Sequence, residues 1–144
     1  MNTKILLCLH KPSVIQHSEL FVPINVGRTI LNKKRITNEV SSHVYEWMIN
    51  NTIGDDSGDN ISDLNPFFCE LTAVYWAWKN YELSDYVGLV HYRRFFKTGL
   101  IKHKILLEEK IIKYMKDVDI ILPKKFYFPR KVWNNYFEAG CGKE

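Results

Sequence analysis

The chain has 144 residues, of which 46% are hydrophobic and 25% are charged, and its formal net charge is +4. This length and composition fit one globular domain or a piece of one, and they exclude a disordered chain. The mild positive charge suits an anionic ligand or a membrane surface, but it is too weak to indicate nucleic-acid binding. The aromatic share of 14% is high, and aromatic rings supply buried area or platforms for sugars and bases.

The first strand is expected over residues 4–10, because the run ILLCL is continuously apolar and a Lys-Pro pair follows it closely. A run without alternation predicts burial on both faces of a sheet. Residues 19–26 (ELFVPINV) suggest a short extended piece, which Pro23 would confine to a sheet edge. Apolar side chains near helical spacing favour a helix over residues 39–49.

Residues 54–63 (GDDSGDNISD) place several carboxylates and two glycines in one short loop. Their mutual repulsion predicts a compensating cation, a basic partner or helix N–H groups. An ordinary solvated turn is the alternative, since Gly, Asp, Asn and Ser are the common turn formers. The loop is not an EF-hand, because the sixth and twelfth positions from Asp55 are Asn60 and Pro66 rather than Gly and Glu. A divalent ion shared with a diphosphate, Mg²⁺ or Mn²⁺, stays open.

A central helix is expected from residue 65 to about residue 80, with Asn65 as its N-cap and Pro66 in its first turn. Glu70 lies in the first turns, where the helix dipole favours a carboxylate, so a purely structural role for it is an alternative to chemistry. The predicted apolar stripe of this helix consists of Phe67, Leu71, Val74 and Trp78.

Residues 86–91 (YVGLVH) form the clearest strand and lead into the cluster HYRRFF. An amphipathic helix over residues 106–115 and a third strand over residues 118–122 follow. This alternation of strands and helices predicts an α/β sandwich with a mostly parallel sheet. In open parallel sheets, ligands bind beyond the carboxyl ends of the strands.

All three predicted strands end in polar or basic side chains, so a basic rim is expected to face the acidic loop across one edge of the sheet. Such a rim suits a phosphate-bearing ligand, because arginine matches phosphate oxygens two at a time. Adjacent arginines in a strand point to opposite faces, so one of them is expected to pair with Glu70 or with an aspartate of the loop. The rim consists of His10-Lys11, His91-Tyr92-Arg93-Arg94 and Lys124-Lys125.

The cysteines at positions 8, 69 and 141 stand far apart and show no Cys-x-x-Cys or zinc-type spacing. A reducing compartment is therefore expected. The apolar run near the N-terminus is too short for a signal peptide, and no stretch approaches a membrane-spanning helix. The sequence predicts a cytoplasmic protein, with the inner face of the cytoplasmic membrane as an open alternative.

Five segments resemble the DUF4422 domain family, in the expected order from about residue 4 to residue 125. That family occurs in bacterial capsular, exopolysaccharide and lipopolysaccharide gene clusters and is treated as glycosyltransferase-like. The resemblance implies a GT-A-like fold that transfers a sugar from a nucleotide diphosphate donor to a glycan or lipid-linked acceptor. The segments are residues 9–12 (LHKP), 21–28 (FVPINVGR), 54–62 (GDDSGDNIS), 65–80 (NPFFCELTAVYWAWKN) and 86–96 (YVGLVHYRRFF).

Members of the family normally continue well past this point, which implies that residues 1–144 are the N-terminal portion of one domain. The sheet is then expected to be incomplete at the C-terminus, with residues 126–144 as a divergent tail. Weak or no transferase activity is expected of this polypeptide alone. A non-catalytic remnant that binds donor or scaffolds a polysaccharide assembly system is the alternative function.

GT-A-type folds carry an Asp-x-Asp motif near the position that His91-Tyr92-Arg93 occupies here. We therefore expect the basic cluster and the acidic loop to replace that motif and to hold the donor diphosphate. The acidic loop opposes a polyanion, which disfavours nucleic acid as a partner. The expected catalytic residues are Asp59 and Glu70. The expected substrate-binding residues are His10, Asp55, Asp56, Asn60, His91, Tyr92, Arg93 and Arg94, and no residue is assigned to a metal.

Overall fold

A computed structural model describes residues 3–15, 18–81, 84–94, 113 and 118–122. The chain divides into two compact units, Met1–Tyr114 and Met115–Glu144. All the helices and strands named below belong to the first unit.

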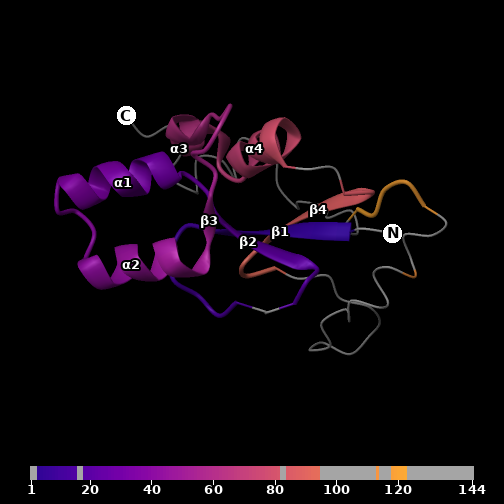
Figure 1. Cartoon of the computed structure of the whole chain (residues 1–144), viewed down its shortest axis with the longest axis horizontal. Coiled ribbons are helices and arrows are strands. Elements are labelled where there is room, and N and C mark those ends of the chain that lie inside the picture. The colour runs from indigo at the N-terminus through magenta and orange to yellow at the C-terminus, as the bar shows by residue number, and fades with distance from the viewer. Residues whose placement is uncertain (1–2, 16–17, 82–83, 95–112, 114–117, 123–144) are drawn as a thin grey trace, which may run out of the picture. The chain divides into compact units, whose positions relative to one another are not determined.

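A four-stranded parallel sheet is the framework of the first unit (Figure 1), with the strand order β3-β2-β1-β4. The predicted α/β class, the parallel sheet and the strands near residues 4–10 and 86–91 are thereby confirmed. The central strand β1 is buried on both faces, as its unbroken apolar run predicted, and its residues from Ile5 to Leu9 are at most 2% exposed. The strands are β1 (Thr3–Leu9), β2 (Phe21–Asn25), β3 (Ile53–Gly54) and β4 (Tyr86–His91).

The strand β2 lies between β1 and β3 and is not an edge strand, although it contains Pro23. The Val26 N–H donates to Leu9 O of β1, and strand alternation therefore turns the Pro23 nitrogen to the opposite side. On that side β3 pairs only with Ile24 and Asn25. The sheet tolerates the proline because the bond it cannot make is not required there.

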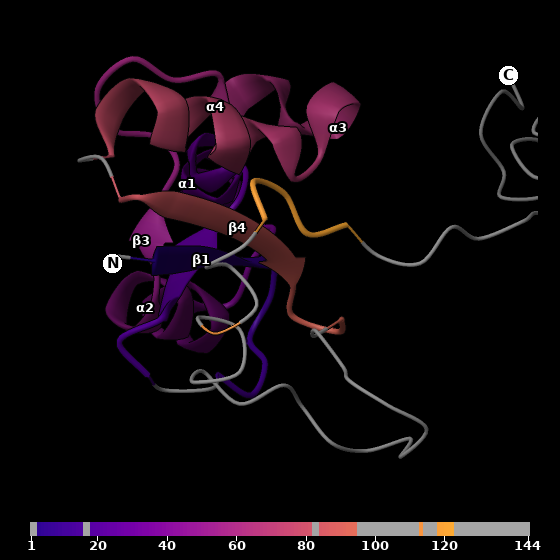
Figure 2. The same ribbon diagram turned by 90° about the vertical axis from the view of Figure 1, so that its right-hand side faces the viewer.

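Helices cover the sheet on both sides, and Figure 2 shows α4 and α2 on opposite sides of β1 and β4. The helix expected over residues 39–49 begins slightly later, where the Ser41 hydroxyl accepts the Val44 N–H as an N-cap. The helix α1 was not predicted, because its sequence RTILNKKRI is largely polar. The helices are α1 (Arg28–Ile36), α2 (Ser42–Asn51), α3 (Asn65–Phe68) and α4 (Leu71–Asn80), with a 3-10 turn η1 (Ser62–Leu64) before α3.

The single helix predicted from residue 65 to residue 80 is wrong, because the chain turns a corner between α3 and α4. Cys69 has φ 48° and ψ −128°, which breaks the helical hydrogen bonding. Asn65 is not an N-cap either, and its side-chain amide reaches forward to donate to Cys69 O at 2.8 Å. The hydrogen bonds of this corner thus pair backbone groups that a continuous helix was expected to pair.

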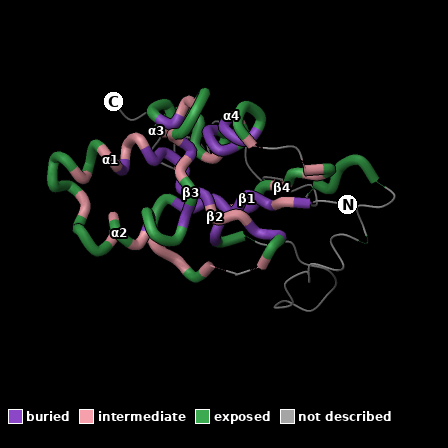
Figure 3. The backbone as a smooth tube through the Cα atoms, in the orientation of Figure 1, coloured by how far each residue is buried: buried purple, intermediate pink, exposed green. Residues whose placement is uncertain are grey.

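The apolar stripe predicted for this region lies on the exposed face of α4 and not on its buried face. Trp78 is 72% exposed and Leu71 is 58% exposed, whereas small side chains such as Ala73 and Ala77 face the sheet. Trp76 is buried on the same face, at 7% exposed, and it packs in one core cluster with Ala73 and Ala77. Figure 3 shows the same contrast between the buried sheet and the exposed outer surfaces of the helices.

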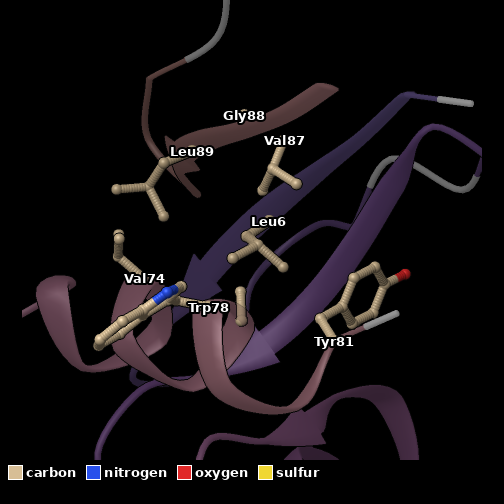
Figure 4. A pocket seen from close by; sticks show the side chains of 8 residues that line it. Leu6, Val74, Trp78, Tyr81, Val87, Gly88 and Leu89 are labelled. Atoms are coloured by element: carbon tan, nitrogen blue, oxygen red, sulfur yellow. The ribbon is translucent and has the colours of Figure 1, made fainter. Parts of the chain in front are cut away.

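The exposed side of α4 borders an apolar groove of about 400 Å³ above β1 and β4 (Figure 4). Val74 and Trp78 form its helical wall, and Leu6, Val87 and Leu89 rise from the strands. Val87 and Leu89 are therefore exposed on an edge strand of the sheet.

Of the two elements expected beyond β4, the structure tests only the strand. The helix predicted over residues 106–115 lies outside the described residues, apart from Lys113. Residues 118–122 are described and exposed, and they form no strand. An apolar run becomes a strand only where a neighbouring strand supplies hydrogen-bond partners, which the sequence pattern does not report.

The carboxylate of Asp55 is fully buried and joins three parts of the unit. Its oxygens accept two N–H groups at the start of α1 and two hydroxyl groups from η1 and α4. Helix N–H groups thus compensate one charge of the acidic loop, which is one of the three means that the sequence suggested. The donors are Gly27 N (2.8 Å), Arg28 N (2.9 Å), Ser62 Oγ (2.6 Å) and Thr72 Oγ1 (2.6 Å).

The Arg28 side chain is buried beside this junction and ties α1 to β2 and α2. Its Nε donates to Asn25 Oδ1 at 2.7 Å, and one terminal nitrogen donates to Thr52 O and Met48 O at the end of α2. Those carbonyls carry the negative end of the α2 dipole. Burial lowers the pKa of Arg28, nearby Asp56 opposes that shift, and the guanidinium stays charged.

Replacement of Asp55 by asparagine tests this junction. Asp55→Asn places an NH₂ group against two of the four donors, and we expect it to lower the free energy of unfolding by about 3 kcal/mol. Urea denaturation followed by circular dichroism measures the change. Asp63→Asn, at an exposed aspartate of the same loop, is the matched control and is expected to stay within about 0.5 kcal/mol of the native chain. Equal stability of the two variants would contradict the assignment.

Candidate functional site

A cluster of rings forms where the adjacent parallel strands β1 and β4 end. The register pairs Cys8 with His91, so the residues that follow both strands meet at one edge of the sheet. The ring centroids of His10 and His91 are 6.0 Å apart, and those of His91 and Tyr92 are 4.3 Å apart. His10 also meets Tyr92 edge-on at 5.4 Å. The structure brings together these three predicted site residues.

Glu70 faces this cluster from the corner before α4. Its Oε1 lies 3.6 Å from His91 Nε2, and its side chain is 38% exposed against 15% for His91. The Arg93 N–H donates to His91 Nδ1 at 3.2 Å, which makes Nδ1 the acceptor of the neutral ring and leaves the proton on Nε2. The imidazole therefore presents a donor to the carboxylate, an arrangement suited to holding or moving a proton.

Burial is the main influence on the titration of both histidines. It lowers the pKa of His10 and of His91 from the ordinary value of 6.5. Lys11 and Arg93 lower the pKa of His10 further, and Arg93 also lowers that of His91. Glu70 opposes both shifts because its charge favours the protonated rings. Both imidazoles are therefore mainly neutral at pH 7.

The two arginines are exposed and lie in a turn beyond β4. The strand ends at His91, and the Arg94 N–H donates to His91 O at 2.7 Å, so the alternation expected of a continuing strand does not apply. The Arg93 guanidinium lies 5.4 Å from the centroid of the Tyr92 ring. Among the described residues, the side chain that faces the Glu70 carboxylate is that of His91 and not an arginine as predicted. The predicted Lys124-Lys125 part of the rim lies outside the described residues.

Tyr92 connects the rings to the interior. Its side chain is only 8% exposed, and its hydroxyl has no hydrogen-bond partner within the described part of the chain. Buried hydroxyl groups normally have a hydrogen-bond partner, so this unpaired oxygen beside the ring cluster is an exception.

The acidic loop folds over helices rather than facing the basic rim. Asp56 Oδ2 accepts the Asn32 side-chain amide of α1 at 3.1 Å, and Asp59 Oδ1 accepts the Tyr75 hydroxyl of α4 at 3.0 Å. Asn60 uses its amide to close the loop on Asp56 O at 3.0 Å. Within residues 3–15, 18–81 and 84–94, no hydrogen bond or ion pair joins the loop to either arginine. The expected meeting of rim and loop is not observed.

These carboxylates do not fit a shared divalent ion. The oxygens of Asp55 are occupied by four protein donors, and those of Asp56 and Asp59 are directed to different helices. In the described ranges, no group of three or more metal-ligating side chains converges. A site for Mg²⁺ or Mn²⁺ therefore has no support from the geometry of these residues.

Cys8 and Cys69 are free thiols, and Cys141 lies outside the described residues. Burial, with the nearby carboxylates of Glu70 and Asp55, raises the pKa of Cys8 to about 12. This thiol is therefore inert as a nucleophile. In the part of the chain that is described, no helix has the length and apolar character needed to cross a membrane.

Sequence reasoning missed the contact between Glu70 and His91. The strand order would have placed His10 beside His91, because parallel neighbours end at the same edge. The approach of Glu70 depends on the corner at Cys69, which the residue pattern does not indicate because such a position normally carries glycine.

Replacement of Glu70 tests the electrostatics of the cluster. The pKa of each histidine is lower in the folded than in the unfolded state, so the free energy of unfolding decreases as the pH falls below 6.5. Glu70→Gln removes the charge that raises both values, and we expect both titration midpoints to move to lower pH. NMR titration of the imidazole Cε1–H signals measures this. Glu46→Gln, at an exposed position of α2, is the control, and midpoints that rise or stay fixed in Glu70→Gln would refute the contact.

Comparison with known proteins adds to this geometry. The chain is similar to a solved apo structure of the bifunctional glycosyltransferase WbbM, with 36% sequence identity and a TM-score of 0.50. The match covers 76% of this chain and 19% of that chain, so this chain spans about a fifth of the solved relative. The likeness shows a GT-A-like fold, as the sequence predicted. None of the curated proteins matches the chain significantly.

Residues 4–143 match a family described as a domain of unknown function, DUF4422. The match extends over nearly the whole chain and includes every residue of the ring cluster. The chain therefore belongs to the DUF4422 family and is a glycosyltransferase-like domain.

Proposed function

We propose that this domain binds a nucleotide diphospho-sugar at the carboxyl ends of β1 and β4. The observation that carries the proposal is the convergence of His10, His91 and Tyr92 beside Glu70 at one edge of the parallel sheet. Ligands of open parallel sheets bind at this edge, where connections diverge. The likeness to a glycosyltransferase supports a sugar donor as the ligand class.

The cations at this edge supply the charge that a diphosphate requires. Lys11, Arg93 and Arg94 are exposed, and they follow the same two strand ends as the rings. A guanidinium can bind two phosphate oxygens at once, which neutralises the leaving group as its charge builds. The neutral imidazoles add hydrogen-bond donors and acceptors for the ligand, and the Tyr92 ring packs against both of them.

Glu70 is the base that we assign to the transfer. Its carboxylate takes the proton of the acceptor hydroxyl while the new bond forms between that oxygen and the sugar C1. The bond from C1 to the phosphate oxygen breaks, and its electron pair leaves with the nucleoside diphosphate. His91 directs its Nε2 toward this carboxylate at 3.6 Å.

Asp59, which the sequence also suggested as catalytic, does not share this site. It contacts Tyr75 and lies 3.7 Å from Lys79 in the second half of α4, whereas Glu70 precedes the first turn. These two contacts of Asp59 are at residues about one and a half to two and a half helical turns after Glu70, or roughly 8 to 14 Å along the helix. We therefore propose only Glu70 as the proton acceptor.

The wider role that we propose is bacterial capsular, exopolysaccharide or lipopolysaccharide synthesis in the cytoplasm. The DUF4422 membership supports this role, and a glycan or lipid-linked acceptor fits it. The free thiols fit a reducing compartment.

Calorimetry with UDP, GDP and dTDP tests donor binding. At least one nucleotide is expected to bind, and Arg93→Ala or Arg94→Ala is expected to weaken it about tenfold, since a charge-assisted hydrogen bond contributes roughly 1.5 kcal/mol or more. Lys34→Ala, which removes an exposed cation of α1, is the matched control. Binding that is absent in the native chain, or unchanged in both arginine variants, would sink the proposal.

A product assay with the matching nucleotide sugar separates an enzyme from a binding module. Glu70→Gln is expected to abolish transfer while nucleotide binding persists. Binding without any turnover in the native chain would identify a binding module instead.

A further inference from the structure

The corner between α3 and α4 holds a non-glycine residue in a left-handed conformation. Cys69 has φ 48° and ψ −128°, and Glu70 follows with φ −66° and ψ −12°. These are the angles of a type II′ turn, whose first central residue is normally glycine because a Cβ is strained there. Strained backbone of this kind persists only where its surroundings enforce it, and it is concentrated at functional sites.

Asn65 supplies the enforcing contacts from both its backbone and its side chain. Its carbonyl accepts the Cys69 N–H at 2.8 Å, and its side-chain amide donates to the Cys69 carbonyl at 2.8 Å. The same amide lies 3.3 Å from the Thr72 hydroxyl, which in turn donates to Asp55. Asn65 therefore bonds to both peptide groups of Cys69, and the Cys69 carbonyl also accepts the Thr72 N–H at 3.3 Å and lies 3.1 Å from the Thr72 hydroxyl.

The Asn65 side chain is itself wedged against Gly27. A Cβ on Gly27 would lie 2.8 Å from the Asn65 Cγ, and Gly27 has φ 70°. Gly27 is anchored in turn by its N–H bond to Asp55. The support of the corner thus extends back to the buried junction at the start of α1.

Glu70 depends on this corner for its orientation. It occupies the N-cap position of α4, yet its side chain makes no capping hydrogen bond. The described contact of its carboxylate is the one with His91. A half-exposed side chain with one such contact is placed mainly by its backbone, which the corner sets.

We propose that Asn65 is a positioning residue, which clamps Cys69 in its left-handed conformation and so presents the Glu70 carboxylate to His91. This inference rests on the proposed function, since it is that function which gives the Glu70–His91 pair its chemical role. The contacts themselves do not depend on it.

The titration of His91 tests the clamp without any ligand. The charged and titratable groups around His91 are Glu70, which raises its pKa, and Arg93, His10 and Arg94, which lower it. Asn65→Ala is expected to move the His91 midpoint to lower pH, in the same direction as Glu70→Gln. The double variant Asn65→Ala with Glu70→Gln is expected to match Glu70→Gln alone. Asn50→Ala, at an exposed asparagine of α2, is expected to leave the midpoint unchanged.

A rescue variant separates positioning from a general loss of structure. Glycine adopts the corner conformation without strain, so Cys69→Gly added to Asn65→Ala is expected to return the midpoint toward the native value. The proposal would be overturned by an Asn65→Ala midpoint equal to the native one. It would also be overturned if the midpoint of Asn65→Ala with Cys69→Gly stayed as displaced as that of Asn65→Ala alone. If Asn65→Ala does not fold, the His91 midpoint of Asn65→Ala with Cys69→Gly is compared with that of the native chain, and a displaced midpoint overturns the proposal. Failure of nucleotide binding would sink the proposed function and leave this titration result standing.

Discussion

Four donors converge on the buried carboxylate of Asp55, and this arrangement determines how the chain leaves the sheet. The two N–H groups belong to the start of α1, and the two hydroxyl groups belong to Ser62 near the end of the acidic loop and to Thr72 in α4. A loop that carries several like charges is thereby drawn into the interior at one point. The corner that carries Glu70 is braced against the same carboxylate through Thr72, so the site inherits its geometry from this bond network.

The parts of the fold that sequence predicts well are those in which one residue run determines one element. The continuous apolar runs of β1 and β4 both form strands where expected, although only β1 is buried on both faces. The alternation of strand and helix likewise gives the parallel sheet. Parallel neighbours end together, so the grouping of His10 with His91 and Tyr92 follows from the strand order alone.

The parts that sequence does not predict depend on contacts between distant residues. The α4 helix buries Trp76 with Ala73 and Ala77 and leaves Trp78 exposed, and a pattern with apolar residues on both faces does not tell which of the two tryptophans faces the sheet. The break at Cys69 requires the Asn65 side chain, which by itself resembles an ordinary N-cap. For the acidic loop, the pattern does not distinguish a carboxylate that binds a ligand from one that caps a helix, and Asp55 is of the second kind.

The buried Arg28 gives this architecture a property that the ring cluster does not share. A guanidinium keeps its charge at every pH that a cell encounters, so the joint between β2, α1 and the end of α2 contains a cation that never titrates. At the carboxyl end of the same sheet, two imidazoles whose pKa is lowered from 6.5 gain charge as the pH falls. Acidification would therefore add positive charge at the ring cluster, while the buried Arg28 guanidinium keeps both its charge and its hydrogen bonds.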